Sequence, residues 1–154
     1  MPAIEQLIKQ TKFQNARHKA MISVMYASNM IVDHYESIFK KFHLTLQQYN
    51  ALRILRGQYP KACTVNLIRE RMLDKMSDAS RIVERLRRAG YVERVTNKED
   101  RRAVDVLITE KGLDLLKQVD KLESEMNLPA NTISEKEALE LNEILNKVIN
   151  GLID

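Results

Sequence analysis

The most restrictive feature of this chain is a change of hydrophobic period at Gly90. When residues 77–89 are spaced 100° apart, as on a helix, four apolar side chains share one face: Ala79, Ile82, Val83 and Leu86. Gly90 follows them, and Gly is the residue preferred just past a helix C-terminus. Residues 91–95 and 103–108 then alternate with a period of two, which is typical of β-strands. The sequence therefore predicts a helix that leads directly into a β-hairpin.

Three more helices are predicted before that one. The segment from about Ile4 to Phe42 contains no Gly or Pro, and its apolar residues recur at helical spacing, so we expect one long helix there. A second helix begins after Thr45, which forms a capping box with Gln48. A third and shorter helix runs from Thr64, its cap, to about Leu73.

Two helices are predicted after the hairpin, the first from Glu110 to about Met126 with Thr109 as its cap. The second opens with a capping box at Ser134, and its apolar stripe comprises Leu141, Ile144, Leu145, Val148, Ile149 and Leu152. The predicted fold class is therefore mainly α with a small β-hairpin wing and about six helices. One small core cannot cover the long first helix, so we expect part of it to pack against another subunit, and the last helix is unusually apolar for a terminal element.

Basic residues are concentrated in the first two-thirds of the chain. The net charge of the 154 residues is +4. Residues 1–68 carry nine Lys and Arg against three acids, and residues 69–102 carry eleven against seven. Residues 103–154 reverse the balance, with five lysines against eleven acids. This asymmetry favours a polyanionic partner such as nucleic acid over an acidic small substrate.

Several classes of protein are disfavoured. No apolar run approaches the roughly 20 residues that span a bilayer, and the N-terminal residues lack a charged-then-apolar export pattern. The single cysteine, Cys63, cannot form an internal disulfide, which favours a cytoplasmic location. The three histidines are scattered, and neither a Gly-rich phosphate loop nor metal-ligand spacing is present. We therefore expect no enzyme activity and no cofactor.

Three short helices followed by a hairpin is the order of a winged helix-turn-helix, in which the second helix of the pair enters the major groove of double-stranded DNA. Here that helix is residues 77–89. Its first residues would lie nearest the base edges: Ser77, Asp78, Ser80 and Arg81. Arg81 is the best-suited reader because a guanidinium can donate two hydrogen bonds to guanine. Arg85, Arg87 and Arg88 are better placed for phosphates, and Thr64 of the preceding helix is also a candidate contact. The alternative is that these arginines only solvate an exposed helix.

The hairpin tip carries an unusual run of charge. Four of its residues are candidate DNA contacts: Lys98, Asp100, Arg101 and Arg102. An arginine on a slender hairpin can enter the minor groove, where narrow A·T segments concentrate negative potential. Asp100 can accept a hydrogen bond from Arg102 and so hold its guanidinium in one orientation. A solvated turn is the alternative.

These stretches together resemble the multiple-antibiotic-resistance regulators, the MarR family. The resemblance lies in residues 80–86 (SRIVERL), 89–94 (AGYVER) and 100–112 (DRRAVDVLITEKG), the last of which is similar to the wing signature of the family. It implies a homodimeric transcriptional regulator, usually a repressor, that reads a pseudo-palindrome. It also implies release by a small aromatic or lipophilic ligand bound between the dimerisation helices and the DNA-binding lobe.

The resemblance implies one MarR-like domain over residues 1–154. Residues 44–109 would form the DNA-binding lobe, and residues 1–42 and 110–154 the helical dimerisation region. Candidates for lining a ligand crevice are Met21, Met25, Tyr26, Tyr35, Phe39 and Tyr49, although such a stripe is more often core.

Some residues depart from the family pattern, and one rival function remains open. Arg69 replaces a small residue, and Asp78 stands where a hydroxyl residue is common. Cys63 is not placed like the oxidant-sensing cysteine of some relatives, so we expect a structural thiol. A winged-helix module that binds protein rather than DNA is the alternative function.

Overall fold

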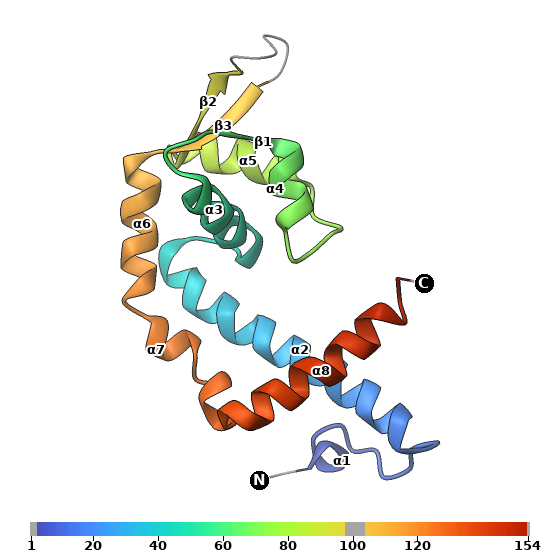
Figure 1. Cartoon of the computed structure of the whole chain (residues 1–154). Helices are drawn as coiled ribbons and strands as arrows, with labels where there is room; N and C mark the ends of the chain where they lie inside the picture. The colour runs from blue at the N-terminus through green and yellow to red at the C-terminus, as the bar shows by residue number, and fades with distance from the viewer. Residues whose placement is uncertain (1–2, 98–103, 154) are drawn as a thin grey trace. The chain divides into compact units, whose positions relative to one another are not determined.

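The computed structural model describes residues 3–97 and 104–153 and falls into two compact units, Met1–Lys121 and Leu122–Asp154 (Figure 1). The first unit contains α1 (Ile4–Leu7), α2 (Ala16–Phe39), η1 (Lys40–Phe42), α3 (Leu46–Gln58), β1 (Cys63–Thr64), α4 (Val65–Arg71), α5 (Ala79–Arg88), β2 (Val92–Thr96), β3 (Val104–Ile108) and α6 (Glu110–Asp120). The second contains α7 (Glu123–Met126), η2 (Ala130–Thr132) and α8 (Glu135–Asn150). This mainly helical chain with a small antiparallel sheet confirms the predicted fold class.

The sheet has three antiparallel strands in the order β1-β3-β2. The predicted hairpin forms, with Val92 opposite Ile108 and Thr96 opposite Val104. The third strand, β1, pairs Cys63 with Val106 and was not predicted. Two residues are too few to show the alternation by which a strand is recognised in a sequence.

The core of the first unit lies where α3, α4 and α5 meet β3 and α6. Helix α5 contributes the predicted stripe, since Ala79, Val83 and Leu86 are buried and Ile82 is half-buried. The largest fully buried side chains of this unit are Phe39, Leu52, Leu55, Ile68, Met72, Leu86, Ile108, Leu116, Val83, Val106 and Val119. This packing holds α5 firmly while its opposite face stays exposed to solvent.

The prediction of one unbroken helix from Ile4 to Phe42 was wrong. The chain leaves α1 after Leu7, and Lys9 adopts a left-handed backbone with φ 53°. Helix α2 begins only after Asn15, whose side chain accepts a hydrogen bond from the backbone N–H of His18 at 2.9 Å. Asn is among the best N-cap residues, so a local cap opens a second helix where hydrophobic spacing shows no interruption.

The predicted caps form as expected. Each cap hydroxyl accepts a hydrogen bond from the backbone N–H three residues on, at 3.1 to 3.3 Å, in the pairs Thr45–Gln48, Thr64–Leu67, Thr109–Gly112 and Ser134–Glu137. Both predicted capping boxes, at Thr45 and Ser134, are complete. Such caps satisfy N–H groups that have no partner within the helix, and so they set where each helix starts.

The helix predicted from Glu110 to Met126 is broken into two. Helix α6 ends at Asp120, and α7 begins after Leu122, which has φ −97° and ψ 17°. A ψ near 17° cannot continue the α-helical ladder. The boundary between the two units falls at the same place. No Gly or Pro marks this break in the sequence.

Helix α8 buries none of its 16 residues against the rest of the second unit. Its exposed apolar side chains include Leu141, Ile144 and Ile149, each between 44% and 57% exposed. No helix among the described residues is long and apolar enough to cross a membrane.

Candidate nucleic-acid interface

Asp78 organises the start of α5, which begins at Ala79 rather than at the predicted Ser77. Its Oδ1 accepts a hydrogen bond from the backbone N–H of Arg81 at 3.0 Å, and its Oδ2 lies 3.5 Å from Arg81 Nε. A carboxylate is favourable at the positive end of a helix dipole. Asp78, which departs from the family pattern, is therefore the cap of this helix. It also lies next to Nε of Arg81, whose side chain is 82% exposed.

A groove lies between the start of α3 and the first two turns of α5. Its lining residues are Thr45, Gln47, Gln48, Ser77, Asp78, Arg81, Ile82 and Arg85. The structure thus brings together four of the predicted contact residues and adds two glutamines from α3. Gln47 was not predicted as a contact, and Gln48 was predicted only as the partner of Thr45 in its capping box, although polar amides beside a helix cap are a usable indication. An amide can both donate to phosphates and accept from bases.

The other predicted contact residues that the structure describes do not line this groove. Ser80 is exposed on α5. Thr64 belongs to β1 and caps α4, its Oγ1 accepting from the N–H of Leu67 at 3.1 Å. Arg88 lies at the opposite end of α5 from Asp78. The hairpin-tip residues Lys98, Asp100, Arg101 and Arg102 lie outside the described residues.

Glu84 gathers three arginines into one cluster. Its carboxylate accepts two hydrogen bonds from Arg87, at 2.9 and 3.0 Å, and one from Arg88 at 3.1 Å. Arg94 of β2 approaches the same carboxylate at 3.5 Å. Hydrogen bonds from Arg87 and then Arg88 lower the pKa of Glu84 to about 2. The ionised carboxylate therefore holds basic groups of α5 and β2 in fixed relative positions at neutral pH.

The wing signature has a structural explanation at the junction of α5 and α6. Gly90 has φ 79°, the left-handed conformation that ends α5. The Thr109 hydroxyl donates to the carbonyl oxygen of Gly90 at 2.8 Å. The Lys111 ammonium donates to the Ala89 carbonyl at 2.7 Å and lies 4.9 Å from the centre of the Tyr91 ring. We call this arrangement the α5–α6 clasp, because it joins the end of the basic helix to the start of the next.

Gly112 completes the α5–α6 clasp by close approach. A Cβ atom at this position would lie 2.3 Å from the Tyr91 carbonyl oxygen and 2.8 Å from Ile108 Cγ1. Both distances are below the van der Waals contact limit, so only a residue without a side chain fits there. The signature residues Thr109, Lys111 and Gly112 therefore fix the end of α5. This role requires no contact between them and a binding partner such as DNA.

Comparison with known proteins relates the helix-turn-helix part of this chain to a known family. A family model described as the MarR family matches residues 43–103, which span the helix-turn-helix and the start of the hairpin. PecS of Dickeya dadantii, an HTH-type transcriptional regulator, is 25% identical over 138 residues, which cover 87% of this chain and 82% of PecS. MgrA of Staphylococcus aureus, with the same description, is 26% identical and covers 89% of this chain and 92% of its own.

Residues 43–103, about two-fifths of the chain, match the MarR family. Members of this family are DNA-binding transcriptional regulators rather than enzymes. Two solved structures align over almost the whole chain. Sco3205 of Streptomyces coelicolor, solved in complex with DNA, has a TM-score of 0.78 at 20% identity and covers 92% of this chain and 91% of its own. BpsR of Bordetella bronchiseptica, whose DNA binding is regulated by 6-hydroxynicotinic acid, has a TM-score of 0.73 at 19% identity, covering 90% and 96%. At these identities the likeness shows the fold.

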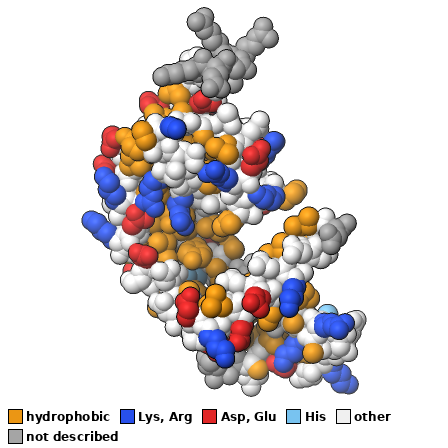
Figure 2. Space-filling model, viewed as in Figure 1, with side chains coloured by type: hydrophobic (Ala, Val, Ile, Leu, Met, Phe, Trp, Pro, Cys, Tyr) orange, Lys and Arg blue, Asp and Glu red, His pale blue; other side chains and the backbone are white. Residues whose placement is uncertain are grey.

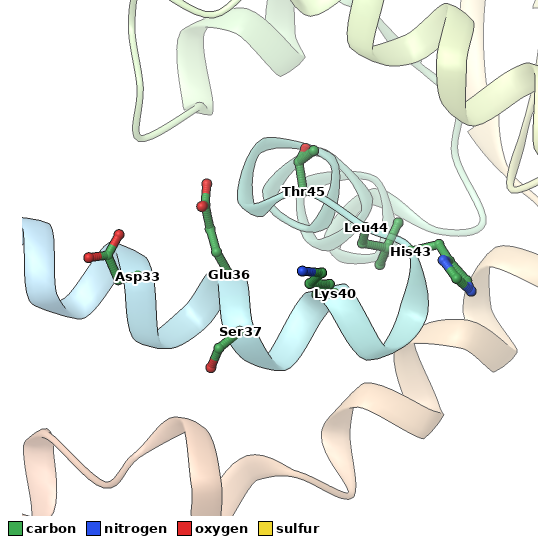
Figure 3. Close-up of a pocket in the computed structure, with 7 residues that line it drawn as sticks. All are labelled: Asp33, Glu36, Ser37, Lys40, His43, Leu44 and Thr45. Atoms are coloured by element: carbon green, nitrogen blue, oxygen red, sulfur yellow. The ribbon is translucent and has the colours of Figure 1, made fainter.

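A pocket beside the end of α2 differs from the crevice expected from the MarR family. It is lined by Asp33, Glu36, Ser37, Lys40, His43, Leu44 and Thr45. Figure 3 shows Glu36 and Ser37 on opposite sides of α2, with Thr45 contributed by the start of α3. None of the six aromatic and methionine candidates lines this pocket. A site with two carboxylates, a lysine and a histidine is more polar than a lipophilic ligand prefers.

Two of the aromatic candidates belong to the core. Phe39 stacks on Tyr49 with ring centroids 4.1 Å apart and on Tyr35 at 5.9 Å. Phe39 is fully buried and Tyr49 nearly so. Burial raises the pKa of the Tyr49 hydroxyl. Met21 and Met25 lie exposed on α2 instead. Neither the pocket of Figure 3 nor the groove between α3 and α5 is lined by any of the six candidates.

Cys63 is buried in β1, 5% exposed. Burial, and to a smaller extent the charge of Asp105, raises the pKa of its thiol. A buried thiol with little thiolate character reacts slowly with oxidants, in agreement with the expected structural role. Within residues 3–97 and 104–153, no group of three His, Cys, Asp or Glu side chains is arranged to hold a metal ion.

Proposed function

We propose that this chain is a homodimeric repressor that binds a pseudo-palindromic operator and is released by a small aromatic or lipophilic ligand. The observation that carries the DNA-binding part is the convergence of Ser77, Arg81 and Arg85 in one groove at the start of α5. The N-terminal residues of the second helix in this motif are the ones that meet base edges. The capped and exposed Arg81 is therefore our candidate for reading guanine through two hydrogen bonds.

Phosphate contacts are proposed for the remaining basic residues of α5. Arg85 forms none of the ion pairs found among the described residues, so its charge is available to a phosphate. The arginines held by Glu84 add a second basic cluster at the other end of the helix. Figure 2 shows Lys and Arg side chains spread over the visible face of the lobe that carries α3 to α5. Such contacts supply affinity without sequence information.

The hairpin tip is proposed as a minor-groove contact on the basis of its sequence. Arg102 is the candidate for insertion, and Asp100 is the candidate for orienting it. The strands that lead to the tip are described by the structure and pair in register from Val92–Ile108 to Thr96–Val104. This pairing supports the proposal because it confirms that residues 98–103 connect two paired antiparallel strands.

The DNA-binding proposal is tested by selecting bound fragments from random duplex DNA at low salt. We expect an inverted repeat with half-sites about one helical turn, roughly 10 base pairs, apart. Its association constant should fall steeply with salt because phosphate contacts release counterions. Arg102→Ala should bind the selected duplex more weakly. If no sequence is enriched and Arg102→Ala binds DNA like the wild type, the proposed minor-groove contact is wrong, and a winged-helix module that binds protein becomes the favoured function.

Dimerisation is proposed through residues 1–42 and 110–154, with residues 44–109 as the DNA-binding lobe. Two helices support it. Helix α8 buries no residue, although it is well capped and carries an apolar stripe. Helix α2 buries only Ile38 and Phe39 of its 24 residues and exposes five large apolar side chains: Met21, Val24, Met25, Met30 and Ile31. Apolar faces of this size mark interaction surfaces, and a two-fold dimer is the commonest way to cover them.

Replacement of Ile144 by glutamate is expected to weaken the dimer. Burying such a side chain is worth about 2 kcal/mol, and a two-fold interface contains it twice, so the dissociation constant should rise roughly a hundredfold or more. Sedimentation velocity over a range of concentrations measures the change. Asn146→Glu is the matched control, because it adds the same charge on the opposite, polar side of α8. Equal effects of the two variants would contradict an α8 interface.

Ligand release is proposed by analogy with BpsR, whose DNA binding is regulated by 6-hydroxynicotinic acid. The polar pocket of Figure 3 contains Lys40 and His43, which can donate hydrogen bonds to the carboxylate of an aromatic acid, beside the like-charged Asp33 and Glu36. Repeating the titration of the selected duplex with a panel of aromatic carboxylates tests this part. A panel that leaves DNA binding unchanged would remove aromatic acids from the proposal.

A further inference from the structure

The turn between α4 and α5 displays an exposed methionine beside the groove. Met76 is 93% exposed, the most exposed large hydrophobic side chain among the described residues. Leu73, in the same turn, is 82% exposed. The turn is anchored at both ends, since Met72 before it and Ala79 after it are buried in the core. Figure 1 shows this segment as the loop between α4 and α5.

The exposure of Met76 comes from a fixed backbone and not from a loose loop. The backbone N–H of Met76 donates to Asp74 Oδ1 at 2.9 Å, and the Ser77 hydroxyl donates to Asp74 Oδ2 at 2.7 Å. These two hydrogen bonds, that from Ser77 first, lower the pKa of Asp74. The N–H of Leu73 donates to the side chain of Asn50 in α3 at 3.0 Å. Each end of the turn therefore has its own side-chain partner, and the Met76 side chain projects from a defined position.

The position of Met76 puts it next to the proposed base-reading residues. It directly precedes Ser77, which lines the groove together with Arg81 and Arg85. In the helix-turn-helix motif, residues at the start of the second helix approach base edges in the major groove. Phosphates and most base-edge groups are polar. The thymine C5-methyl is the apolar group that the major groove of DNA offers. An exposed apolar side chain at this site therefore has one complementary feature on DNA.

We infer that Met76 is a specificity-determining residue that reads thymine by packing its thioether side chain on the C5-methyl group in the major groove. An unbranched, polarisable side chain can adjust its rotamers to reach that methyl from a fixed backbone. The two hydrogen bonds to Asp74 would hold the backbone while the side chain adapts. This inference rests on the proposed function, because it requires α5 to lie in the major groove.

Deoxyuridine provides the test, since it differs from thymidine only by the missing C5-methyl. In the duplex selected by the wild-type protein, each thymine is replaced singly by uracil, and the dissociation constant is measured for every duplex. The wild type should bind about fourfold more weakly when one particular thymine of each half-site is replaced, the effect expected for one buried methyl-sized group. Met76→Ala should bind the thymine duplex more weakly and should show no further loss at that same position.

Leu73→Ala is the matched control, because it shortens an equally accessible apolar side chain of the same turn. It should retain the wild-type response to uracil. Both side chains are more than four-fifths exposed, so neither replacement removes core packing. The inference is overturned if no thymine responds in the wild type, if Met76→Ala still responds, or if Leu73→Ala loses the response. If selection enriches no duplex at all, the proposed function itself fails and the reading of thymine fails with it.

Discussion

Replacement of Gly112 by alanine is expected to lower the free energy of unfolding by about 3 kcal/mol, near the upper end of what overpacking costs. The added Cβ would meet the Tyr91 carbonyl oxygen at 2.3 Å and Ile108 Cγ1 at 2.8 Å. The carbonyl cannot simply move aside, because it accepts a hydrogen bond from the N–H of Thr109 at 3.0 Å. Relief of the clash therefore has to disturb either the sheet or the start of α6.

Urea denaturation measures this loss, and Gly57→Ala is the matched control. Gly57 lies in α3, and a Cβ there would meet nothing within 4 Å. In a helix, alanine is favoured over glycine by about 0.5–1 kcal/mol, so this variant should be slightly more stable than the wild type. Equal stability of Gly112→Ala and the wild type would show that the α5–α6 clasp tolerates a side chain.

The Gly112 variant also tests how the clasp affects function. The clasp holds Ala89 and Gly90, the last residues of α5, through Lys111 and Thr109. Loss of stability at this junction should therefore be accompanied by weaker binding of the selected duplex, although Gly112 is buried and contacts no DNA in the proposal.

Replacement of Arg81 by alanine is expected to weaken binding of the selected duplex and to relax sequence preference at one base pair of each half-site. A guanidinium that pairs bidentately with guanine contributes about 1–3 kcal/mol of discrimination, which corresponds to roughly five- to 150-fold in the dissociation constant. Asp78 would remain as the helix cap, because its Oδ1 accepts from the backbone of residue 81 and not from the side chain. Stability should therefore change little.

Titrations of Arg81→Ala and Arg85→Ala against the selected duplex and single-base variants separate reading from phosphate binding. Both arginines line the same groove, so they form a matched pair. Arg85→Ala should weaken binding of all duplexes alike and reduce the slope of log K against log salt by about one. If Arg81→Ala also weakens all duplexes alike, Arg81 contacts phosphate, and another residue reads the base.

Part of the candidate site could be predicted from local sequence patterns. The four arginines of α5 and the cap positions follow from helical spacing and residue type, and the structure places Ser77, Asp78, Arg81 and Arg85 around one groove. The contribution of Gln47 was missed because it comes from another helix. The sequence allows only part of the Glu84 cluster to be predicted. Arg87 and Arg88 lie three and four residues after Glu84 on the same helix, whereas Arg94 belongs to a strand.

The MarR resemblance was carried by the same kind of local information. The residues that carry this resemblance end α5, form β3 and begin α6. The structure explains several of them by contacts at the junction of α5 and α6. The sequence could not show why a lysine and a glycine follow Thr109, because their partners Ala89 and Tyr91 lie on the other side of the hairpin.

The caps at Thr45, Thr64, Thr109 and Ser134 and the two strands of the hairpin were predictable from the sequence, because helix caps and hydrophobic periods depend on residues a few positions apart. The strand at Cys63–Thr64 and the division after Lys121 were decided only by the folded chain. So was the ion pair between Arg56 and Asp120, 64 positions apart, at 2.6 Å. Such features depend on which surfaces contact each other when the helices pack. Short-range sequence patterns do not specify contacts between residues that are far apart in the chain.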